Sequence, residues 1–567
     1  MSSLYIKDSL ALLDYTAQYY DTAEEFLSSD EFKLFISHYL KHLKAHYHEL
    51  YGWLVDNSTE DDGHLDDFLI KMLKLLTVLS FDDSVRLNEE DRPILLEIVE
   101  RGYNFWRNMH RYSIVRSSNS SGLLLSNFMD ADERFNHMVL SLYRMIQEKL
   151  QGSRNNIYRQ LQAGTNACLL LYQHDFGFEG RFKQLSTVPV VRKVMMRSPI
   201  IIHLKHNKRI GTFTETKIHP LNEIRDWSDF ICFPIYVGNS LTFVYFHKNF
   251  TASAIGLANL FEFANVDMKN TKPDCIILFG VEDEKDDTTY YFDEDQQIYI
   301  GKISYSPIIE YFGYFKKMAL TLHNLAMIKK GYLPIHGAML NIYLEDGSHK
   351  GVCLMGDSGA GKSETIEALN RIADEIERQD LIFDDMGTMY INDKGEVVCI
   401  GTEIGAFVRL DDLDAASAYK DLDRSIFFNP GNTNSRVITP ASTYDLITSE
   451  HKVDIFLYAN NYDDKRGLHI FDNVEEAKPV FLEGKRMALG TTNEVGYSTT
   501  YFANPFGPMQ EKEVCDEIID KTFKKIKENG VMLGEIYTNL GLPNKGDGGI
   551  EVAARALLEL IKSKGSK

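Results

Sequence analysis

Residues 352–363 read VCLMGDSGAGKS, and the expectations for the rest of the chain are built outward from this stretch. Its first four residues are mostly apolar and predict a short buried strand. Glycines at 356 and 361, followed directly by Lys362 and Ser363, complete the spacing of a phosphate-binding loop. Residues 364–376, ETIEALNRIADEI, then predict a helix whose N-terminus faces the phosphates. Strand, loop and helix together are the context that distinguishes such a loop from a chance match.

The residue types of the loop fit the chemistry of a nucleoside triphosphate. Glycines let the backbone curl so that successive N–H groups point at phosphate oxygens. Lys362 is expected to reach the β- and γ-phosphates, and the hydroxyl of Ser363 to ligate Mg²⁺. The sequence therefore predicts binding of ATP with magnesium by the following residues: Gly356, Asp357, Ser358, Gly359, Ala360, Gly361, Lys362 and Ser363.

Composition narrows the class of protein. The formal charge of −21 over 567 residues argues against a nucleic-acid partner, because phosphate backbones repel such a surface. No run approaches the length of a membrane-spanning helix, and the N-terminus lacks the pattern of a signal peptide. The six cysteines are dispersed without a CxxC pair, so we expect reduced core thiols and a cytoplasmic location.

The texture of the sequence changes twice along the chain. Apolar residues at helical spacing predict an all-helical domain over 1–183, which could bind a protein partner or another copy of the chain. Residues 184–303 contain β-rich runs between polar turns and predict a mixed α/β lobe on the substrate side. Residues 304–567 surround the phosphate loop and predict an α/β nucleotide-binding domain. The fold class is therefore α/β with an extra helical domain.

Further chemistry-bearing residues lie near the loop in the sequence. Lys316 and Lys317 are predicted on a helix, and His336 on the strand that precedes the loop. The run LIFDD predicts an apolar strand that ends in two carboxylates, Asp384 and Asp385. Each residue alone is more often a core histidine, a solvated charge or a surface ion pair. Together, and with Arg436 of NTNSRVITP, they supply the cations and metal-binding carboxylates that phosphoryl transfer requires.

The order and spacing of these motifs resemble the nucleotide-binding half of ATP-dependent phosphoenolpyruvate carboxykinase. That family has a tyrosine, a Lys-Lys pair, a strand histidine 19 residues after the second lysine, the phosphate loop and an Asp-Asp pair. This chain has Tyr311, Lys316-Lys317, His336 at the same spacing, GDSGAGKS and FDDMGTM. NSRVITP resembles the segment that contributes the family's arginine, and EGKRMALGTT at 483–492 resembles its mobile lid. The resemblance implies a mixed-sheet core of the carboxykinase type over 304–567.

The resemblance also implies roles for individual residues. A manganese ion would be bound by three side chains, one of which must be a neutral lysine with a lowered pKa: Lys317, His336 and Asp385. Ser363 would bind the magnesium that accompanies ATP, and Lys362 and Arg436 would stabilise the transferred phosphoryl group. Ser358 and Tyr311 would lie beside the organic substrate, oxaloacetate or phosphoenolpyruvate. A lid near 483–507 would close through glycines 484, 490 and 496 and exclude water.

Departures from the family pattern leave the phosphoryl acceptor open. Only Arg197-Ser198-Pro199 remains of the segment whose arginine binds the substrate carboxylate, and the loop ends in GKSE. The string GDSGAGKSE also resembles the bacterial kinase that phosphorylates a serine of the phosphocarrier protein HPr. In a kinase of that kind, Asp384 or Asp385 could act as the base. A non-catalytic nucleotide sensor with a partner-binding helical domain is the third possibility.

Overall fold

The computed structural model describes most of the chain, and contact clustering divides it into two compact units. Unit 1 comprises residues 1–175 and 189–200, and unit 2 comprises 176–188 and 201–567. Unit 2 therefore contains most of the expected substrate-side lobe and the whole of the expected nucleotide domain. The described residues are 4–7, 9–15, 20–59, 64–81, 88–117, 125–151, 165–173, 178–196, 199–224, 226–265, 271–372, 376–410, 424–489, 495–542 and 548–565.

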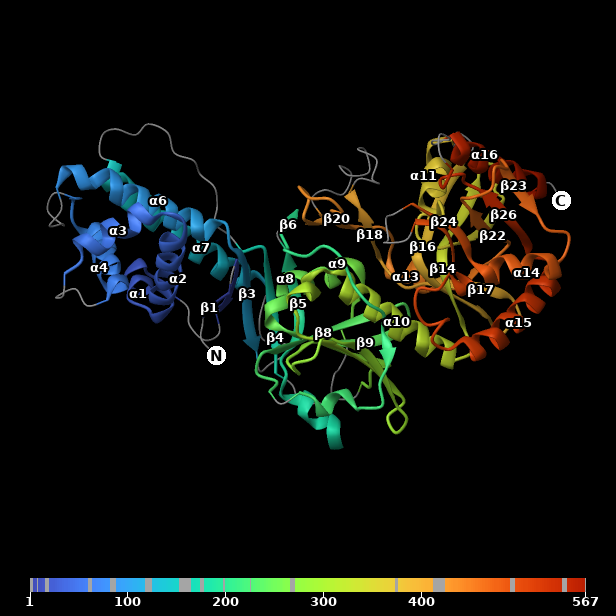
Figure 1. The fold of residues 1–567 in the computed structure, drawn as a ribbon, viewed down its shortest axis with the longest axis horizontal. Helices are drawn as coiled ribbons and strands as arrows, with labels where there is room; N and C mark the ends of the chain where they lie inside the picture. Colours follow the sequence, from blue (N-terminus) through green and yellow to red (C-terminus); the bar gives the residue numbers. More distant parts are fainter. Residues whose placement is uncertain are drawn as a thin grey trace. The chain divides into compact units, whose positions relative to one another are not determined.

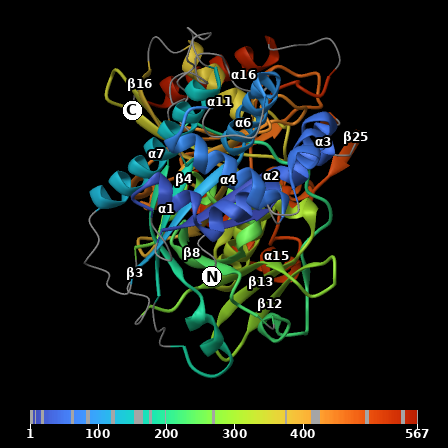
Figure 2. The same cartoon turned by 90° about the vertical axis from the view of Figure 1, so that its left-hand side faces the viewer.

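Unit 1 combines a helical layer with a five-stranded mixed sheet. The strands run in the order β1, β2, β3, β4, β5, and β2, β3 and β4 are parallel to one another. Figures 1 and 2 show the helices packed together from two directions. The elements are β1 (Leu4–Lys7), β2 (Leu10–Asp14), α1 (Ala23–Leu27), α2 (Asp30–His46), α3 (His48–Asn57), α4 (Leu65–Val78), η2 (Glu89–Asp91), α6 (Arg92–Arg107), β3 (His110–Ser117), α7 (Leu125–Gln151), β4 (Ala167–Tyr172) and β5 (Val190–Met196).

Local sequence explains where these helices begin. Thr22 caps α1 and forms a capping box with Glu25. The hydroxyl of Ser29 accepts a hydrogen bond from the N–H of Phe32 at the start of α2. Helices α2, α4, α6 and α7 then bury their apolar faces against one another, and the resulting core is rich in aromatic rings. The unit thus has a core of its own.

The prediction of an all-helical domain over 1–183 was wrong, because β1, β2, β3 and β4 lie within that range. The strands LALLD and ACLLLY are short apolar runs without alternation. Such runs fit a buried strand and a buried helix equally well, so periodicity alone does not separate them. Helices nevertheless make up much of this range, since α2, α3, α4, α6 and α7 lie within it.

The first part of unit 2 contains a sheet in the order β8, β9, β11, β13, β12, β7, with β10 also paired to β8. Helix α10 (Gly313–Lys329) packs on β11 and β13. The other elements of this part are η4 (Gly180–Thr187), β6 (Ile200–Ile202), β7 (Thr214–Glu215), η5 (Pro220–Asn222), β8 (Phe230–Val237), β9 (Ser240–His247), η6 (Lys248–Phe250), α8 (Thr251–Ala254), α9 (Leu257–Leu260), β10 (Glu262–Phe263), β11 (Cys275–Val281), β12 (Thr288–Asp293), β13 (Ile298–Ser304) and η7 (Pro307–Glu310).

The second part of unit 2 is built on an eight-stranded mixed sheet in the order β21, β17, β16, β14, β15, β22, β26, β23. Strands β15, β22 and β26 are parallel, and β14 pairs antiparallel with β15 and β16. These strands are β14 (Leu333–Leu344), β15 (His349–Met355), β16 (Ile376–Ile391), β17 (Val397–Gly401), β21 (His451–Lys452), β22 (Ile455–Asn460), β23 (Gly467–Ile470) and β26 (Met532–Tyr537).

Helices cover both faces of this sheet. Alternate residues of β15 and β22 point to opposite faces, so Leu354 and Leu457 join one core while Cys353 and Phe456 join the other. In Figure 1, α11 (Lys362–Ile372) and α16 (Gly548–Gly565) lie together, apart from α14 (Val474–Glu483) and α15 (Lys512–Asn529). Near-continuous apolar strands are therefore required, as in other sheets covered on both sides.

Smaller elements complete unit 2. Strand β20 pairs antiparallel with β18 and β19, and β24 pairs with β25 as a hairpin. All six cysteines are buried and form no disulfide bonds with one another, which confirms that they are core thiols. No helix among the described residues is long and apolar enough to cross a membrane. The elements are β18 (Gly405–Arg409), β19 (Ile426–Phe428), β20 (Arg436–Pro440), α13 (Tyr444–Thr448), β24 (Lys485–Leu489), β25 (Val495–Thr499) and η10 (Tyr501–Ala503).

One strand prediction needs correction. Asp384 and Asp385 do not end their strand, because β16 continues to Ile391 and pairs on both sides. The backbone of Asp385 instead has φ = 124°, an unusual value for a residue with a side chain. The carboxylates are thus presented from the middle of a long strand at a local irregularity. Such irregularities re-aim side chains and are frequent beside functional sites.

Candidate active site

The loop between β15 and α11 has the strand–loop–helix context that the sequence predicts. Its first glycine is tied to the neighbouring strand, since the N–H of Gly356 donates to the carbonyl of His336 at 3.1 Å. Gly361 has φ = 98°, and a Cβ there would lie 2.7 Å from Thr538. Both the dihedral angle and the close approach require glycine at this position.

Lys362 and Ser363 lie at the start of α11 and point toward the loop and β16. Lys362 is buried, and its Nζ donates to the carbonyl of Asp357 at 3.2 Å. The hydroxyl of Ser363 donates to Oδ1 of Asp384 at 3.0 Å. Burial raises the pKa of Asp384 despite the charge of Lys362 nearby. The first N–H groups of a helix generally lack partners within it, so the start of α11 adds backbone donors to this lysine and hydroxyl.

Three of the expected metal-binding side chains converge from three separate elements. Lys317 comes from α10, His336 from β14 and Asp385 from β16. Nζ of Lys317 lies 3.0 Å from Oδ2 of Asp385, and Nε2 of His336 lies 3.1 Å from its Oδ1. The sheet register explains why His336 lies near Asp385, because His336 on β14 pairs with Met386, which follows Asp385 on β16.

The hydrogen bonds of His336 identify its tautomer. Its Nδ1 lies 2.7 Å from the carbonyl oxygen of Ala503, which can only accept, so Nδ1 carries a proton. Burial and the charge of Lys362 lower the pKa of His336, which favours the neutral ring. Nε2 then presents a lone pair to the Asp385 carboxylate, another acceptor. Two acceptors in contact call for a cation between them, and a carbonyl behind the imidazole is the usual support of a metal-binding histidine.

The two lysines beside Asp385 differ in electrostatic state. Burial, together with the charge of Lys316, lowers the pKa of Lys317, although Asp385 opposes that shift. For Lys316, the carboxylates of Asp385 and Glu403 outweigh burial and raise the pKa. The pKa of Asp385 is held well below its usual range because the two lysines and His336 outweigh its burial. The surroundings thus lower the pKa of Lys317 while they hold Lys316 charged and Asp385 ionised.

Glu403 belongs to this cluster and was not foreseen from the sequence. It follows β17, is buried, and its Oε1 lies 3.2 Å from Nζ of Lys316. Burial raises the pKa of Glu403 to about 7, and the lysines only partly offset that effect. A single glutamate in GTEIG carries no spacing signal, so only the fold could place it here.

Arg436, Tyr311 and Lys316 all lie near the aromatic ring of Phe407. The guanidinium of Arg436 lies 5.6 Å from the ring centroid of Phe407, and Nζ of Lys316 lies 5.7 Å from the same centroid. The ring of Tyr311 is 6.2 Å from that of Phe407. Nε of Arg436 is buried, and no hydrogen bond to it is found in the described part of the chain. Nη2 of the half-buried Arg436 donates to Oδ1 of Asn434 at 2.9 Å, and a guanidinium with no carboxylate partner among the described residues is suited to an anionic ligand.

The expected substrate arginine, Arg197, lies outside the described residues, as does Ser198. Another arginine, Arg209, lies near Tyr311 and packs between the rings of Phe213 and Phe506, at 5.3 Å and 5.0 Å. Burial lowers the pKa of Arg209, and none of the described carboxylates pairs with it. Sequence reasoning missed this residue because KHNKRIG reads as a solvated basic run.

The hairpin β24–β25 contacts the phosphate loop through Asp357. Nε of Arg486 lies 3.2 Å from Oδ2 of Asp357, and the hydroxyl of Thr500 donates to the same oxygen at 2.8 Å. Arg486 also donates to the carbonyl of Ser358, whose residue is exposed. Gly484 begins the hairpin with φ = 56°, and Gly496 has φ = 96°. The expected hinge at 490 lies outside the described residues.

The donor set fits a divalent metal only if lysine serves as a ligand. In the described ranges no group of three or more His, Cys, Asp or Glu side chains is arranged to hold a metal ion. With Lys317 included, three donors converge: an amine whose pKa is lowered, the lone pair on Nε2 of His336 and the ionised Asp385. No known protein-family model matches the chain, and no curated protein sequence matches it.

Proposed function

We propose that the chain is an ATP- and metal-dependent phosphoryl-transfer enzyme of the phosphoenolpyruvate carboxykinase type, with a carboxykinase-like core in unit 2. The observation that carries the proposal is the convergence of Lys317, His336 and Asp385 beside Lys362 and Ser363. A purely structural role would not explain why a histidine lone pair faces a carboxylate, because both groups are hydrogen-bond acceptors. A site for Mn²⁺ next to a site for ATP with Mg²⁺ accounts for both features.

In the proposed reaction, oxaloacetate loses carbon dioxide, and the enolate oxygen attacks the γ-phosphorus of ATP to give phosphoenolpyruvate and ADP. A divalent cation bound by Lys317, His336 and Asp385 would polarise the keto oxygen. Lys362 and Arg436 neutralise the charge on the transferred group. Arg209 and Tyr311 orient the carboxylate of the substrate, and hairpin β24–β25 excludes water from the enolate.

In the test, the purified full-length chain is incubated with ATP, Mn²⁺ and oxaloacetate. Formation of phosphoenolpyruvate is followed with a coupled enzyme that consumes it. The reverse direction, with ADP, bicarbonate and phosphoenolpyruvate, should form ATP. The expected result is product in both directions, dependent on Mn²⁺ and lost in Lys362→Ala. Turnover of ATP without any phosphoenolpyruvate, with the same dependence, would reject oxaloacetate as the substrate.

A kinase that phosphorylates a hydroxyl is the second candidate. It is favoured by Asp384, whose raised pKa and contact with Ser363 suit a general base beside the γ-phosphate. The variant Asp384→Asn distinguishes the carboxykinase from the hydroxyl kinase. A general base would be indispensable for transfer to a hydroxyl, whereas carboxykinase chemistry needs no base at that atom. Binding of ATP without turnover on any acceptor would instead favour a sensor.

A further inference from the structure

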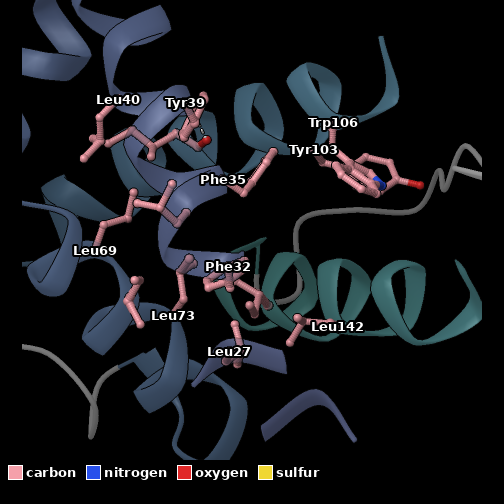
Figure 3. Close-up of a cluster of buried hydrophobic side chains, with 14 of the residues drawn as sticks. Leu27, Phe32, Phe35, Tyr39, Leu40, Leu69, Leu73, Tyr103, Trp106 and Leu142 are labelled. Carbon is pink, nitrogen blue, oxygen red and sulfur yellow. Dashed lines mark hydrogen bonds between the residues drawn. The ribbon is translucent and has the colours of Figure 1, made fainter. Parts of the chain in front are cut away.

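The core of unit 1 encloses a cavity of about 120 Å³, far from any residue of the proposed phosphoryl-transfer reaction in the sequence. Interiors of proteins are packed as densely as organic crystals and rarely contain voids larger than a water molecule. This cavity therefore has to be explained. Figure 3 shows the cluster of buried side chains from α1, α2, α4, α6 and α7 to which most of the cavity's lining belongs.

The wall of the cavity is almost wholly apolar and rich in aromatic rings. Phe35 packs edge-on against Trp106 at 5.7 Å, and Trp106 in turn contacts Phe135. Leucine side chains of α1, α4 and α7 complete the wall. An apolar cavity of about 150 Å³ with a similar lining stays dry and binds benzene, which sets the scale of an occupant here.

One polar atom in this wall lacks a partner. Nε1 of Trp106 is buried, and no hydrogen bond to it is found within the described residues. Most polar groups of the wall are satisfied, since Tyr20 donates to Glu31 and Tyr39 donates to the carbonyl of Ile98. An indole N–H buried without an acceptor costs free energy, and a bound acceptor would remove that cost.

We propose that unit 1 binds a small uncharged ring compound that carries one hydrogen-bond acceptor for the N–H of Trp106. The volume limits the compound to about one six-membered ring with a single substituent. An anion is excluded, because none of the described side chains that line the cavity is basic and the carboxylate of Glu31 is among them. The inference is independent of the reaction proposed for unit 2.

Calorimetric titration of the full-length chain with benzene, phenol and benzoate tests the proposal. All three have the same ring, and they differ in the acceptor and in charge. Phenol should bind about fivefold more tightly than benzene, because it gains one hydrogen bond. Benzoate should not bind. Absence of binding by both benzene and phenol, or equal binding of benzoate, would overturn the proposal.

Two variants locate the site. Trp106→Phe keeps the ring and removes the N–H, so benzene should still bind while the fivefold advantage of phenol disappears. Trp227→Phe is the matched control, because Nε1 of Trp227 already donates to Gln184 in unit 2 at 3.0 Å. This control should bind phenol as the wild type does. An unchanged advantage of phenol in Trp106→Phe would show that Trp106 does not contact the ligand.

A cavity-filling variant tests the volume itself. Leu73 lines the cavity, and Leu73→Phe adds atoms on that side. The variant should lose benzene and phenol binding while its thermal unfolding midpoint stays at or above that of the wild type. If Leu73→Phe does not fold, Val139→Leu, a smaller addition on α7, replaces it. Undiminished binding in a folded, filled variant would place the ligand elsewhere and reject the proposal.

Discussion

Nε2 of His336 lies 3.1 Å from Oδ1 of Asp385, while Nδ1 of the same ring donates to the carbonyl of Ala503. The neutral ring therefore directs a lone pair at a carboxylate. Without a cation, such a pair is repulsive, and the ring would have to take up a proton. The pKa of His336 is lowered by burial and by Lys362, which opposes that proton. This geometry suits the proposal that the two side chains share a metal ion.

Replacing His336 by alanine should weaken the binding of Mn²⁺ by at least about tenfold, because one of three protein ligands is lost. ATP binding should change little, since His336 is not part of the loop. Electron paramagnetic resonance of free Mn²⁺ measures the affinity. His469→Ala is the control, because His469 is exposed on β23. An unchanged Mn²⁺ affinity in His336→Ala would remove this residue from the metal site.

Lys362→Ala should lower the rate of phosphoryl transfer by about 100-fold or more, because the cation that neutralises the transferred group is removed. The fold should persist, since the side chain makes a single hydrogen bond to the carbonyl of Asp357. Steady-state kinetics and circular dichroism measure the two effects. Lys452→Ala, at an exposed position of β21, should behave as wild type. Unfolding of Lys362→Ala would instead assign the lysine a structural role.

Glu403→Gln should change how stability depends on pH. The pKa of Glu403 is raised from 4.5 to about 7 by burial, so the folded state prefers the protonated carboxyl. The stability that this preference contributes is present below pH 4.5 and is lost as the pH rises through about 7.

Glutamine mimics the protonated form, so the variant should lose less stability than wild type between pH 5 and pH 8, by up to about 3 kcal/mol. Urea unfolding at both pH values checks this expectation. Parallel pH profiles of variant and wild type would show that Glu403 does not titrate in this range.

The contact between Asp357 and hairpin β24–β25 should fail in acid. Burial alone would raise the pKa of Asp357, but the neighbouring His336, the charge of Arg486 and the hydrogen bonds from Thr500 and Ser358 lower it. The stabilisation is therefore complete above the usual pKa of 3.8 and is lost as the pH falls through the lowered value.

Arg486→Met should break the contact between hairpin β24–β25 and Asp357 at neutral pH, as acid does in the wild type. Hydrogen exchange of β24 and β25 should become faster in this variant, while exchange in β22 stays slow. Lys485→Met is the control, because Lys485 packs on the rings of Tyr462 and Tyr497 rather than on Asp357. Equal exchange of the hairpin in Arg486→Met and wild type would show that the ion pair does not hold it.

Arg209→Met tests the substrate side of the site. The variant keeps the aliphatic stem between Phe213 and Phe506 and removes the charge. KM for oxaloacetate should rise by about tenfold or more, because a charged hydrogen bond to a carboxylate is lost, while ATP affinity stays the same. Initial-rate kinetics separate the two. A KM equal to that of wild type would show that Arg209 does not bind the substrate carboxylate and that another cation does.

Much of the site could be predicted from local sequence. The glycine spacing of the loop, the Lys-Lys pair, the strand histidine and the Asp-Asp pair are all short-range patterns, and the strand and helix expected around the loop are present as β15 and α11. Local patterns failed where the same run of residues is compatible with two different secondary structures. The apolar runs of β2 and β4 were interpreted as helical, and Asp385 was placed at the end of a strand that continues past it.

The sequence by itself determined which residues can take part in phosphate and metal chemistry, because that depends on residue type and on spacing along one strand, loop or helix. Only the tertiary structure decided which of them meet. Glu403 and Arg209 carry no local signal, yet the fold brings Glu403 to Lys316 and Arg209 close to Tyr311. The pKa of Lys317 likewise depends on burial and on charges from other strands, which no stretch of sequence contains.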